Sequence, residues 1–216
     1  MFNRATGLGL DEPATEALVD ETLGFLAGTR SYVSVAPDAR PAELATWLQA
    51  RGLTPGYGWT KFVRPATDPP ESETTLRIER VGNGEAFGAA AAGGFEVPDL
   101  FRDWLALLPA RDGWHCFVAF EGDQPAGAGA LYVTGEIGWL GIGATVPEHR
   151  GKGAQSALIA KRIEAAAELG CEVVVSETGK PIDGRAGPSY RNLVRAGLEP
   201  VYVRPSFQRA ESISGS

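Results

Sequence analysis

Hydrophobic and polar positions follow two different periods along the chain, which predicts a mixture of helices and strands. The clearest helix is expected over residues 154–169, where apolar residues at three- and four-residue spacing share one broad face: Leu158, Ile159, Ile163, Ala166 and Leu169. Gly170 is expected to end this helix. The β-branched run that follows, at 172–176, predicts a buried strand.

Strands and one interrupted helical segment are expected on the N-terminal side of this helix. Apolar runs bounded by turn residues predict strands over 74–81, 114–121, 126–134 and 137–146. The helical pattern over 84–108 is expected to break at Gly93-Gly94 and to restart at Pro98-Asp99. Further along, we expect a helix at 189–196 and a last strand at 201–203.

The first part of the chain shows the same mixture of elements. Helices are expected over 11–28, with Asp11 as the N-cap, and from Pro41 onward. The stretch 65–73 is rich in proline and polar residues and has no apolar period, which is typical of a linker. We therefore expect a first unit at 1–64, a linker at 65–73, a main domain at 74–206 and a polar tail at 207–216.

The order of elements in the first unit recurs near the C-terminus. In both places a helix, a glycine, a strand and a second helix precede a Gly-Leu-x-Pro turn and another strand. The two turns are Gly52-Leu53-Thr54-Pro55 and Gly197-Leu198-Glu199-Pro200. This shared order predicts that the first unit is a truncated copy of the second half of the main domain.

Charge and cysteine content limit the possible functions. The net charge of −7 argues against a nucleic-acid binder or an anionic-membrane binder, because phosphate groups would be repelled. Cys116 and Cys171 lie in apolar surroundings without metal-ligand spacing, so we expect no metal site and a reducing, cytoplasmic location. No segment approaches the ~18 apolar residues that a membrane-spanning helix needs.

One segment carries recognisable chemistry, at the start of the clearest helix. A glycine-rich strand ends at Pro147, and a basic turn leads directly into the helix with the residues Arg150, Gly151, Lys152, Gly153, Ala154 and Gln155. Free N–H groups of a first helical turn, the helix dipole and two cationic side chains together favour an anion such as pyrophosphate. Two commoner phosphate motifs are excluded, because Val146 stands where either the Walker A loop or the dinucleotide fingerprint requires glycine.

The segment 145–153 resembles motif A of the GNAT (Gcn5-related N-acetyltransferase) superfamily, and 189–198 resembles its motif B. The resemblance covers about the last two-thirds of the chain. It implies an α/β fold of the GNAT type, with a mixed central sheet splayed at the acetyl-CoA site and flanked by helices. The first unit resembles a partial, degenerate GNAT-like repeat whose own turn lacks basic residues.

The same resemblance implies an acyltransferase that uses acetyl-CoA as a co-substrate. Backbone groups of Ala144, Thr145 and Val146 would pair with the pantetheine amides, and the N–H groups of 150–155 would hold the pyrophosphate. A primary amine of a small molecule or peptide would attack the thioester directly in a ternary complex. Gln155 departs from the family pattern, which has glycine or alanine at this position.

The sequence offers several candidates for the catalytic acid and the catalytic base and does not select among them. Leu193 stands where the family often has a tyrosine that protonates the thiolate, so Tyr190, one turn earlier, is the candidate acid and a possible cofactor contact. The alternative is that Tyr190 only packs against the cofactor or the core. Trp139 stands near the usual catalytic glutamate, and Glu136, Glu177 or a water chain could take its place.

Three functions remain in competition, of which a nucleotide-binding protein is disfavoured because the two commoner phosphate motifs are excluded. Of the other two, the first is an active acetyl-CoA-dependent N-acyltransferase, and the second is a non-catalytic CoA-binding module with the GNAT fold. Either would act as a monomer with internal pseudo-symmetry or as a homodimer, without nucleic-acid or membrane partners.

Overall fold

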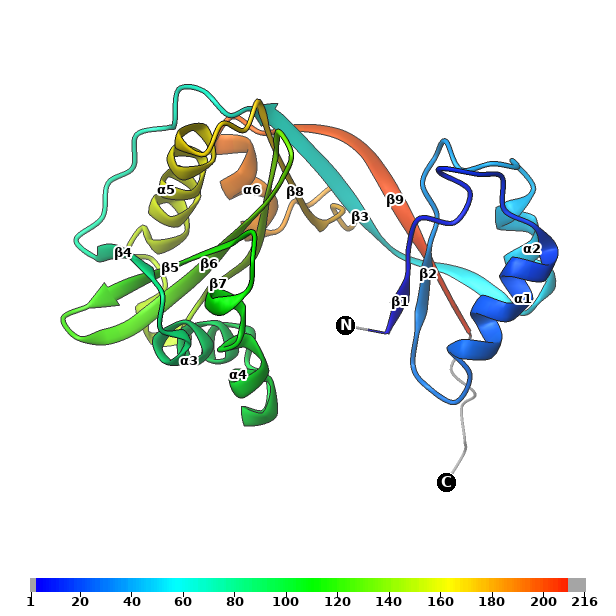
Figure 1. Cartoon of the computed structure of the whole chain (residues 1–216), viewed down its shortest axis with the longest axis horizontal. Helices are drawn as coiled ribbons and strands as arrows, with labels where there is room; N and C mark the ends of the chain where they lie inside the picture. The colour runs from blue at the N-terminus through cyan, green and yellow to red at the C-terminus, as the bar shows by residue number, and fades with distance from the viewer. Residues whose placement is uncertain (1–2, 210–216) are drawn as a thin grey trace. The chain divides into compact units, whose positions relative to one another are not determined.

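The computed structural model describes residues 3–209 and divides the chain into two compact units (Figure 1). The main unit comprises Phe62–Glu177 and Pro188–Pro200. The N-terminal unit holds the residues up to Lys61, together with Thr178–Gly187 and the chain from Val201 onward. Three strands contribute residues to both units: β3 (Leu53–Pro65), β8 (Val173–Gly179) and β9 (Glu199–Arg209).

The main unit is built on a mixed sheet with the strand order β3-β8-β7-β6-β5-β4, to which β3 contributes only its last residues. Neighbouring strands from β4 to β7 are antiparallel, whereas β7 and β8 are parallel. The strand bounds are β3 (Leu53–Pro65), β4 (Arg77–Val81), β5 (Trp114–Glu121), β6 (Gln124–Thr134), β7 (Ile137–Thr145) and β8 (Val173–Gly179). The predicted strands are thus confirmed in their order, with shifts at the ends.

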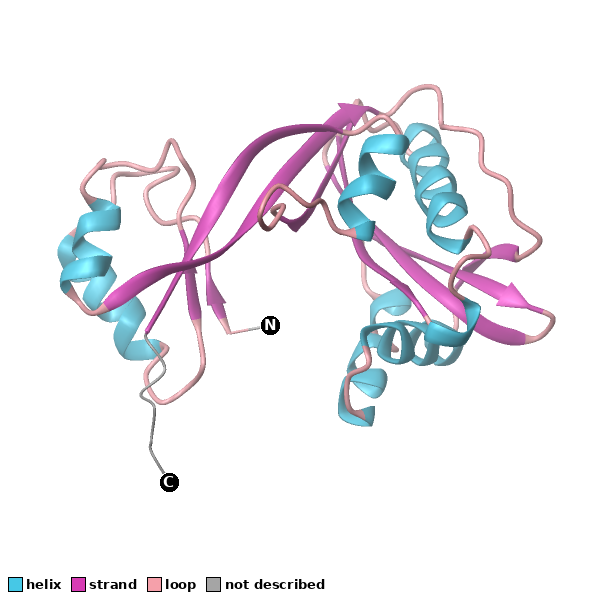
Figure 2. Ribbon diagram, turned by 180° about the vertical axis from the view of Figure 1, so that it is seen from behind, coloured by secondary structure: helices cyan, strands magenta, loops and turns pink. Residues whose placement is uncertain are grey.

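Helices cover both faces of this sheet (Figures 1 and 2). One face carries α3 (Gly84–Phe95) and α4 (Asp99–Leu105), and the other carries α5 (Ala154–Glu168) and α6 (Pro188–Arg195). Alternation along β5 explains the two cores, because successive side chains of a strand point to opposite faces. Cys116 and Val118 pack with α3, while Phe117 packs with α5.

The N-terminal unit is smaller and has its own core. Its strand order is β1-β2-β9-β3, with α1 and α2 packed on it through Val19, Leu44 and Leu48. The elements not yet given are β1 (Arg4–Ala5), α1 (Glu16–Phe25), β2 (Tyr32–Ser34), α2 (Leu44–Ala50) and β9 (Glu199–Arg209). The order α1-β2-α2-β3 matches α5-β8-α6-β9, but the structure does not test the repeat itself, which stays a prediction.

Several helix ends differ from the sequence prediction. The predicted helix 11–28 is too long, because Thr15 and not Asp11 caps α1, through a 3.2 Å bond from the N–H of Leu18 to Thr15 Oγ1. The predicted break at Gly93-Gly94 is wrong, since α3 continues to Phe95 and ends at Glu96 in the left-handed conformation. Gly94 suits this helix because α3 packs closely against β7 at that residue.

The last strand is much longer than predicted, and this changes the C-terminal boundary. β9 runs to Arg209, and Phe207 is buried in the core of the N-terminal unit, so residues 207–209 do not belong to a polar tail. Residues 210–216 of the predicted tail lie outside the described residues. The linear division at 65–73 also differs from the observed one, because the chain returns to the N-terminal unit after the main unit.

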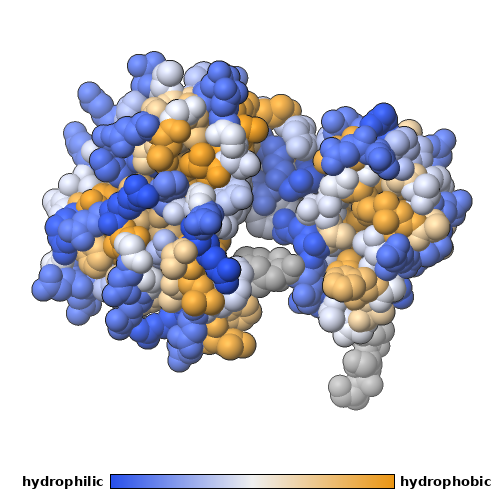
Figure 3. Space-filling view, viewed as in Figure 1, coloured by the Kyte–Doolittle hydropathy of each residue, from blue (hydrophilic) through white to orange (hydrophobic). Residues whose placement is uncertain are grey.

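Hydrophilic residues cover most of the surface seen in Figure 3, and hydrophobic residues lie between them in separate areas. Among residues 3–209, no helix combines the length and the apolar character needed to cross a bilayer.

Two adjacent glycines in α3 give a matched test of the packing between α3 and β7. A Cβ at Gly94 would lie 2.7 Å from the Cβ of Ala144 and 2.7 Å from the backbone nitrogen of Thr145, whereas one at Gly93 would meet Val146 at an ordinary 3.4 Å. We expect Gly94→Ala to lower the free energy of unfolding by about 1–3 kcal/mol. Gly93→Ala should raise it by up to about 1 kcal/mol through helix propensity. Urea denaturation of both variants measures this, and equal stability would contradict the close approach of α3 to β7.

Candidate functional site

A bulge in β7 separates this strand from β8 halfway along its length. β7 pairs in parallel with β8 from Ile137 to Leu140, opposite Val173 to Ser176. In the described part of the chain, the pairing stops after Leu140. The register between β6 and β7 shifts at the same place, and Ile142 has a positive φ of 50°. A β-branched residue rarely adopts this conformation, so the bulge is a strained feature held by its surroundings. The C-terminal half of β7 therefore presents an edge toward the side where β8 departs.

The buried side chain of Arg162 holds this bulge from the α5 side. Its Nε donates to the carbonyl of Leu158 at 2.8 Å, and its Nη1 donates to the carbonyls of Ala130 and Gly141 at 3.2 and 3.0 Å. Ala130 and Gly141 face each other across β6 and β7 next to the bulge. Burial penalises the charged form and lowers the pKa of Arg162 to about 10. The guanidinium thus adds bonds of its own to the last strand pair before the register shift.

The turn between β7 and α5 forms a cradle of backbone N–H groups. Gly151 and Gly153 have positive φ values of 82° and 81°, and a Cβ at Gly153 would lie 2.4 Å from the carbonyl oxygen of Glu73. Gly153 is the N-cap of α5 and offers no side chain to the first turn. Within the described residues, the N–H groups of 154–156 have no hydrogen-bond acceptor. Together with the helix dipole, these groups make an anion site.

Carboxylates pair with both cations of the cradle. Arg150 donates to Glu96 at 3.1 Å, while the ammonium of Lys152 lies 2.6 Å from both oxygens of Glu121. His149 also contacts Glu121, through Nδ1 at 2.5 Å. Hydrogen bonds from Lys152 first, and from His149 second, lower the pKa of Glu121. Arg150 lines the cavity described next, whereas Lys152 does not.

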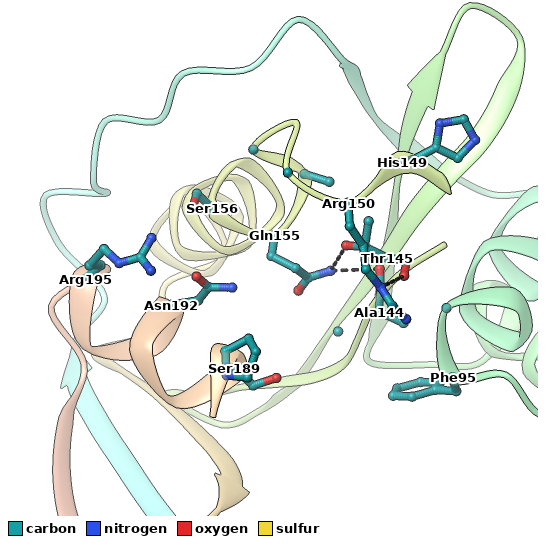
Figure 4. A pocket seen from close by; sticks show the side chains of 16 residues that line it. Phe95, Ala144, Thr145, His149, Arg150, Gln155, Ser156, Ser189, Asn192 and Arg195 are labelled. Atoms are coloured by element: carbon teal, nitrogen blue, oxygen red, sulfur yellow. Dashed lines mark hydrogen bonds between the residues drawn. The ribbon is translucent and has the colours of Figure 1, made fainter. Parts of the chain in front are cut away.

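A cavity of about 710 Å³ opens between the cradle, the free edge of β7 and the facing side of α6 (Figure 4). It lies within the main unit and is lined by Gly94, Phe95, Gly143, Ala144, Thr145, His149, Arg150, Gly151, Gly153, Ala154, Gln155, Ser156, Pro188, Ser189, Asn192 and Arg195. Among the described residues, no group of three or more His, Cys, Asp or Glu side chains is arranged to hold a metal ion.

Most residues expected to bind the cofactor surround this one cavity: Ala144, Thr145, Arg150, Gly151, Gly153, Ala154 and Gln155. Lys152 and Val146 do not line it. Val146 donates its N–H to the carbonyl of Ala126 at 3.0 Å and accepts from the N–H of His149 at 3.0 Å. Both backbone groups of Val146 are therefore hydrogen-bonded within the protein, one to β6 and one to the turn. This differs from the pairing with pantetheine amides that the family resemblance implied for Val146.

The sequence model of the Acetyltransferase (GNAT) family matches residues 84–193, more than half of the chain and the whole cradle. The chain belongs to the GNAT acetyltransferase family. No match was found among curated proteins.

Solved GNAT structures share the fold of this chain. A GCN5-related N-acetyltransferase from Kribbella flavida is 19% identical, with 99% of this chain and 82% of that chain covered and a TM-score of 0.68. One from Sphaerobacter thermophilus is 17% identical over 89% and 66% of the two chains, with a TM-score of 0.71. A tandem GNAT protein from the clavulanic acid biosynthesis pathway is 16% identical over 93% and 70%, with a TM-score of 0.66. The predicted GNAT fold is confirmed.

Tyr190 lies on the side of α6 that faces the core of this GNAT domain. Its ring packs edge-on against Phe62, with centroids 4.9 Å apart, and it does not line the cavity. Ser189, Asn192 and Arg195 do line it, at the spacing of one helical face. This placement favours the packing alternative for Tyr190 over the role of acid. The spacing was visible in the sequence and could have pointed to Asn192 and Arg195.

The acidic candidates for a base also lie outside the cavity lining. Neither Glu136 nor Glu177 lines it, and Trp139 packs against Trp114 with ring centroids 6.0 Å apart. His149 lines the cavity, but Glu121 binds its Nδ1. No sequence pattern pointed to Glu121 or to Arg162, because their partners are distant in the chain.

Replacement of Arg162 tests whether its guanidinium holds the bulge. Arg162→Met removes three hydrogen bonds from a charged, buried guanidinium to main-chain carbonyls, and we expect the free energy of unfolding to fall by about 2 kcal/mol or more. Lys161→Met, at the exposed neighbour that pairs with Glu164, should change it by less than about 0.5 kcal/mol. Urea denaturation compares the two variants. A fully stable Arg162→Met protein would show that the bulge does not depend on this side chain.

The contacts of Glu121 predict a stability that falls in acid. The folded state lowers the pKa of Glu121 below 4.5, so the unfolded chain takes up the proton first as the pH decreases. The stabilisation is fully present above pH 4.5 and is lost as the pH falls through the lowered pKa. In Glu121→Gln, melting temperatures measured from about pH 6 to pH 3 should fall less steeply than in the native protein. An unchanged slope would mean that the contacts of Glu121 do not favour its ionised form.

Proposed function

We propose that this GNAT protein transfers an acetyl group from acetyl-CoA to a primary amine of a small molecule or peptide. The observation that carries the proposal is the single cavity in which the open first turn of α5, Arg150 and the free edge of β7 meet. Each of these features matches a different part of the proposed co-substrate.

The cradle suits the pyrophosphate. Three N–H groups at 154–156 point from the start of a 15-residue helix, and the glycine at 153 allows the backbone to approach a ligand. Arg150 lines the cavity beside them, and Arg195 adds a second cation from α6, for which the described residues provide no ion-pair partner. Backbone donors and cations that converge on one point favour a doubly charged anion.

The free edge of β7 suits the pantetheine arm. Thr145 lines the cavity beyond the point where β8 departs, and its N–H and carbonyl face away from β6, so they can serve an extended ligand as a neighbouring strand would. The thioester would then lie toward the bulge. The amine forms the new N–C bond, the C–S bond breaks with its electron pair on sulfur, the amine loses a proton and the thiolate gains one.

Water is the proposed carrier of both protons. Tyr190 remains a candidate acid that Tyr190→Phe can test, although its contact with Phe62 argues for a role in packing. The expected cytoplasmic location, and a monomeric or homodimeric state, stay predictions.

A non-catalytic CoA-binding module is the second candidate, and one observation favours it. The titratable side chains that line the cavity are His149, Arg150 and Arg195, so the lining contains no aspartate or glutamate. Formation of acetylated product from a panel of amines separates the two functions. Binding without product would support the module.

Calorimetry with acetyl-CoA tests the shared part of both proposals. We expect a micromolar dissociation constant, about 8 kcal/mol of binding free energy. Arg150→Ala should weaken binding about tenfold, because a charged contact to phosphate is lost. Lys152→Ala should weaken it less than about threefold, because Lys152 is paired with Glu121 outside the cavity lining.

These two variants are matched, since each removes one cation from the same turn. Equal losses would contradict the assignment of the anion to the Arg150 side. If the native protein bound neither acetyl-CoA nor CoA, or if ATP competed with them on equal terms, the proposal would fail.

A further inference from the structure

An aromatic ring lies at the point where β7 and β8 part. Trp139 pairs with Tyr132 of β6, and Tyr132 pairs with Trp114 of β5, so the three side chains share one face of the sheet. It is the face that α3 covers, because Cys116, two residues beyond Trp114, packs with that helix. The ring centroids of Trp139 and Trp114 lie 6.0 Å apart with their planes at 86°, and those of Trp114 and Tyr132 lie 5.2 Å apart. These ring contacts support the indole of Trp139 from the side of β5.

The outer edge of this indole covers Gly141. A Cβ at Gly141 would lie 2.2 Å from Cη2 of Trp139 and 2.3 Å from its Cζ3, so only a glycine leaves room for the ring. Gly141 directly follows Leu140, the last residue of β7 that pairs with β8, and it directly precedes the residue with positive φ, Ile142. The free edge of β7 therefore begins beside the ring of Trp139.

The other face and the end of the split are also occupied. On the α5 face, Arg162 donates from Nη1 to the carbonyl of Gly141 at 3.0 Å, and Leu140 packs in the core. Ser176, the last residue of β8 that pairs with β7, donates its hydroxyl to the carbonyl of Leu140 at 2.8 Å. On β7 the lining of the cavity begins at Gly143. A group that extended along the free edge past Gly143 would thus meet the paired strands, the guanidinium or the indole.

We propose that the indole of Trp139 limits the length of the acyl group, so that the site accepts acetyl and excludes longer acyl chains. The inference rests on the proposed function, because it takes a coenzyme A thioester to lie along the free edge of β7 with its carbonyl toward the bulge. Acetyl ends in one methyl group, whereas each further methylene extends the chain toward the ring over Gly141. A close-packed wall takes up added methylenes only if its side chains are displaced. Trp139 is in this sense a specificity-determining residue for the acyl donor.

Binding of coenzyme A thioesters of different chain length tests this wall without any need for turnover. Calorimetry gives the dissociation constants of coenzyme A, acetyl-CoA and butyryl-CoA, which share the nucleotide and the arm and differ only at the sulfur. Trp139→Ala removes the indole, and Trp139→Phe replaces it with a smaller aromatic ring. Ile137→Ala is the control, at a 43% exposed position two residues earlier on the same face of β7.

The expected result is selective for the acyl group. The native protein should bind butyryl-CoA at least about tenfold more weakly than acetyl-CoA, because the two added methylenes meet the indole. In Trp139→Ala this difference should shrink to less than about threefold, with an intermediate value in Trp139→Phe. Affinity for coenzyme A itself should change less than about twofold in both variants, since the nucleotide and the arm do not reach the ring. Ile137→Ala should match the native protein for all three ligands.

Other outcomes overturn the role of Trp139. Equal native affinities for acetyl-CoA and butyryl-CoA would show that the acyl chain does not reach the indole. A native preference for acetyl-CoA that persists in Trp139→Ala would show that another group sets the length, while the proposed function would stand. If Trp139→Ala lost coenzyme A as well, Trp139→Phe would decide, because an unchanged preference there also contradicts the proposal. Failure of the native protein to bind any of the three ligands would instead overturn the proposed function, and the role of Trp139 with it.

Discussion

The geometry of the cavity depends on a positive charge buried beneath the sheet. Arg162 is 2% exposed and satisfies its guanidinium with main-chain carbonyls, two of which face each other across β6 and β7. A buried cation without a carboxylate persists only where its donors are well matched to acceptors. Because these partners flank the bulge, the same bonds that stabilise Arg162 also determine where β7 parts from β8. The free edge of β7 follows from this separation.

Local charge in the cavity opposes the charge of the whole protein. The chain carries a net charge of −7, yet the cavity is lined by Arg150, Arg195 and the open first turn of α5. Glu96 and Glu121 partly neutralise the cradle from outside, and they do so unequally. Arg150 keeps its place in the lining, while Glu121 draws Lys152 away from it. An acidic protein can therefore bind a polyanion at one site. The attraction of several convergent donors at that site exceeds the repulsion from distant surface charges, which salt screens.

Membership of the GNAT family accounts for the scaffold, while the particular residues at the cavity set this protein apart. The family pattern has a small residue where Gln155 stands, and the side chain here bonds to the opposite strand. The tyrosine that the sequence offered in place of the usual acid packs on Phe62. A fold shared at 16–19% identity fixes the path of the backbone and says little about such side chains.

The sequence by itself determined the elements whose signals are local. Strand periods, the amphipathic face of α5 and the glycines of the cradle all depend on neighbours within a few residues, and each was predicted close to its place. The tertiary structure decided what depends on residues distant in the chain. Packing against β7 carried α3 through Gly93-Gly94, and β9 returned to bury Phe207. Bonds across the fold turned Lys152 toward Glu121 and placed Arg162 under the bulge, because a side chain bonds to whichever partner the fold brings within reach.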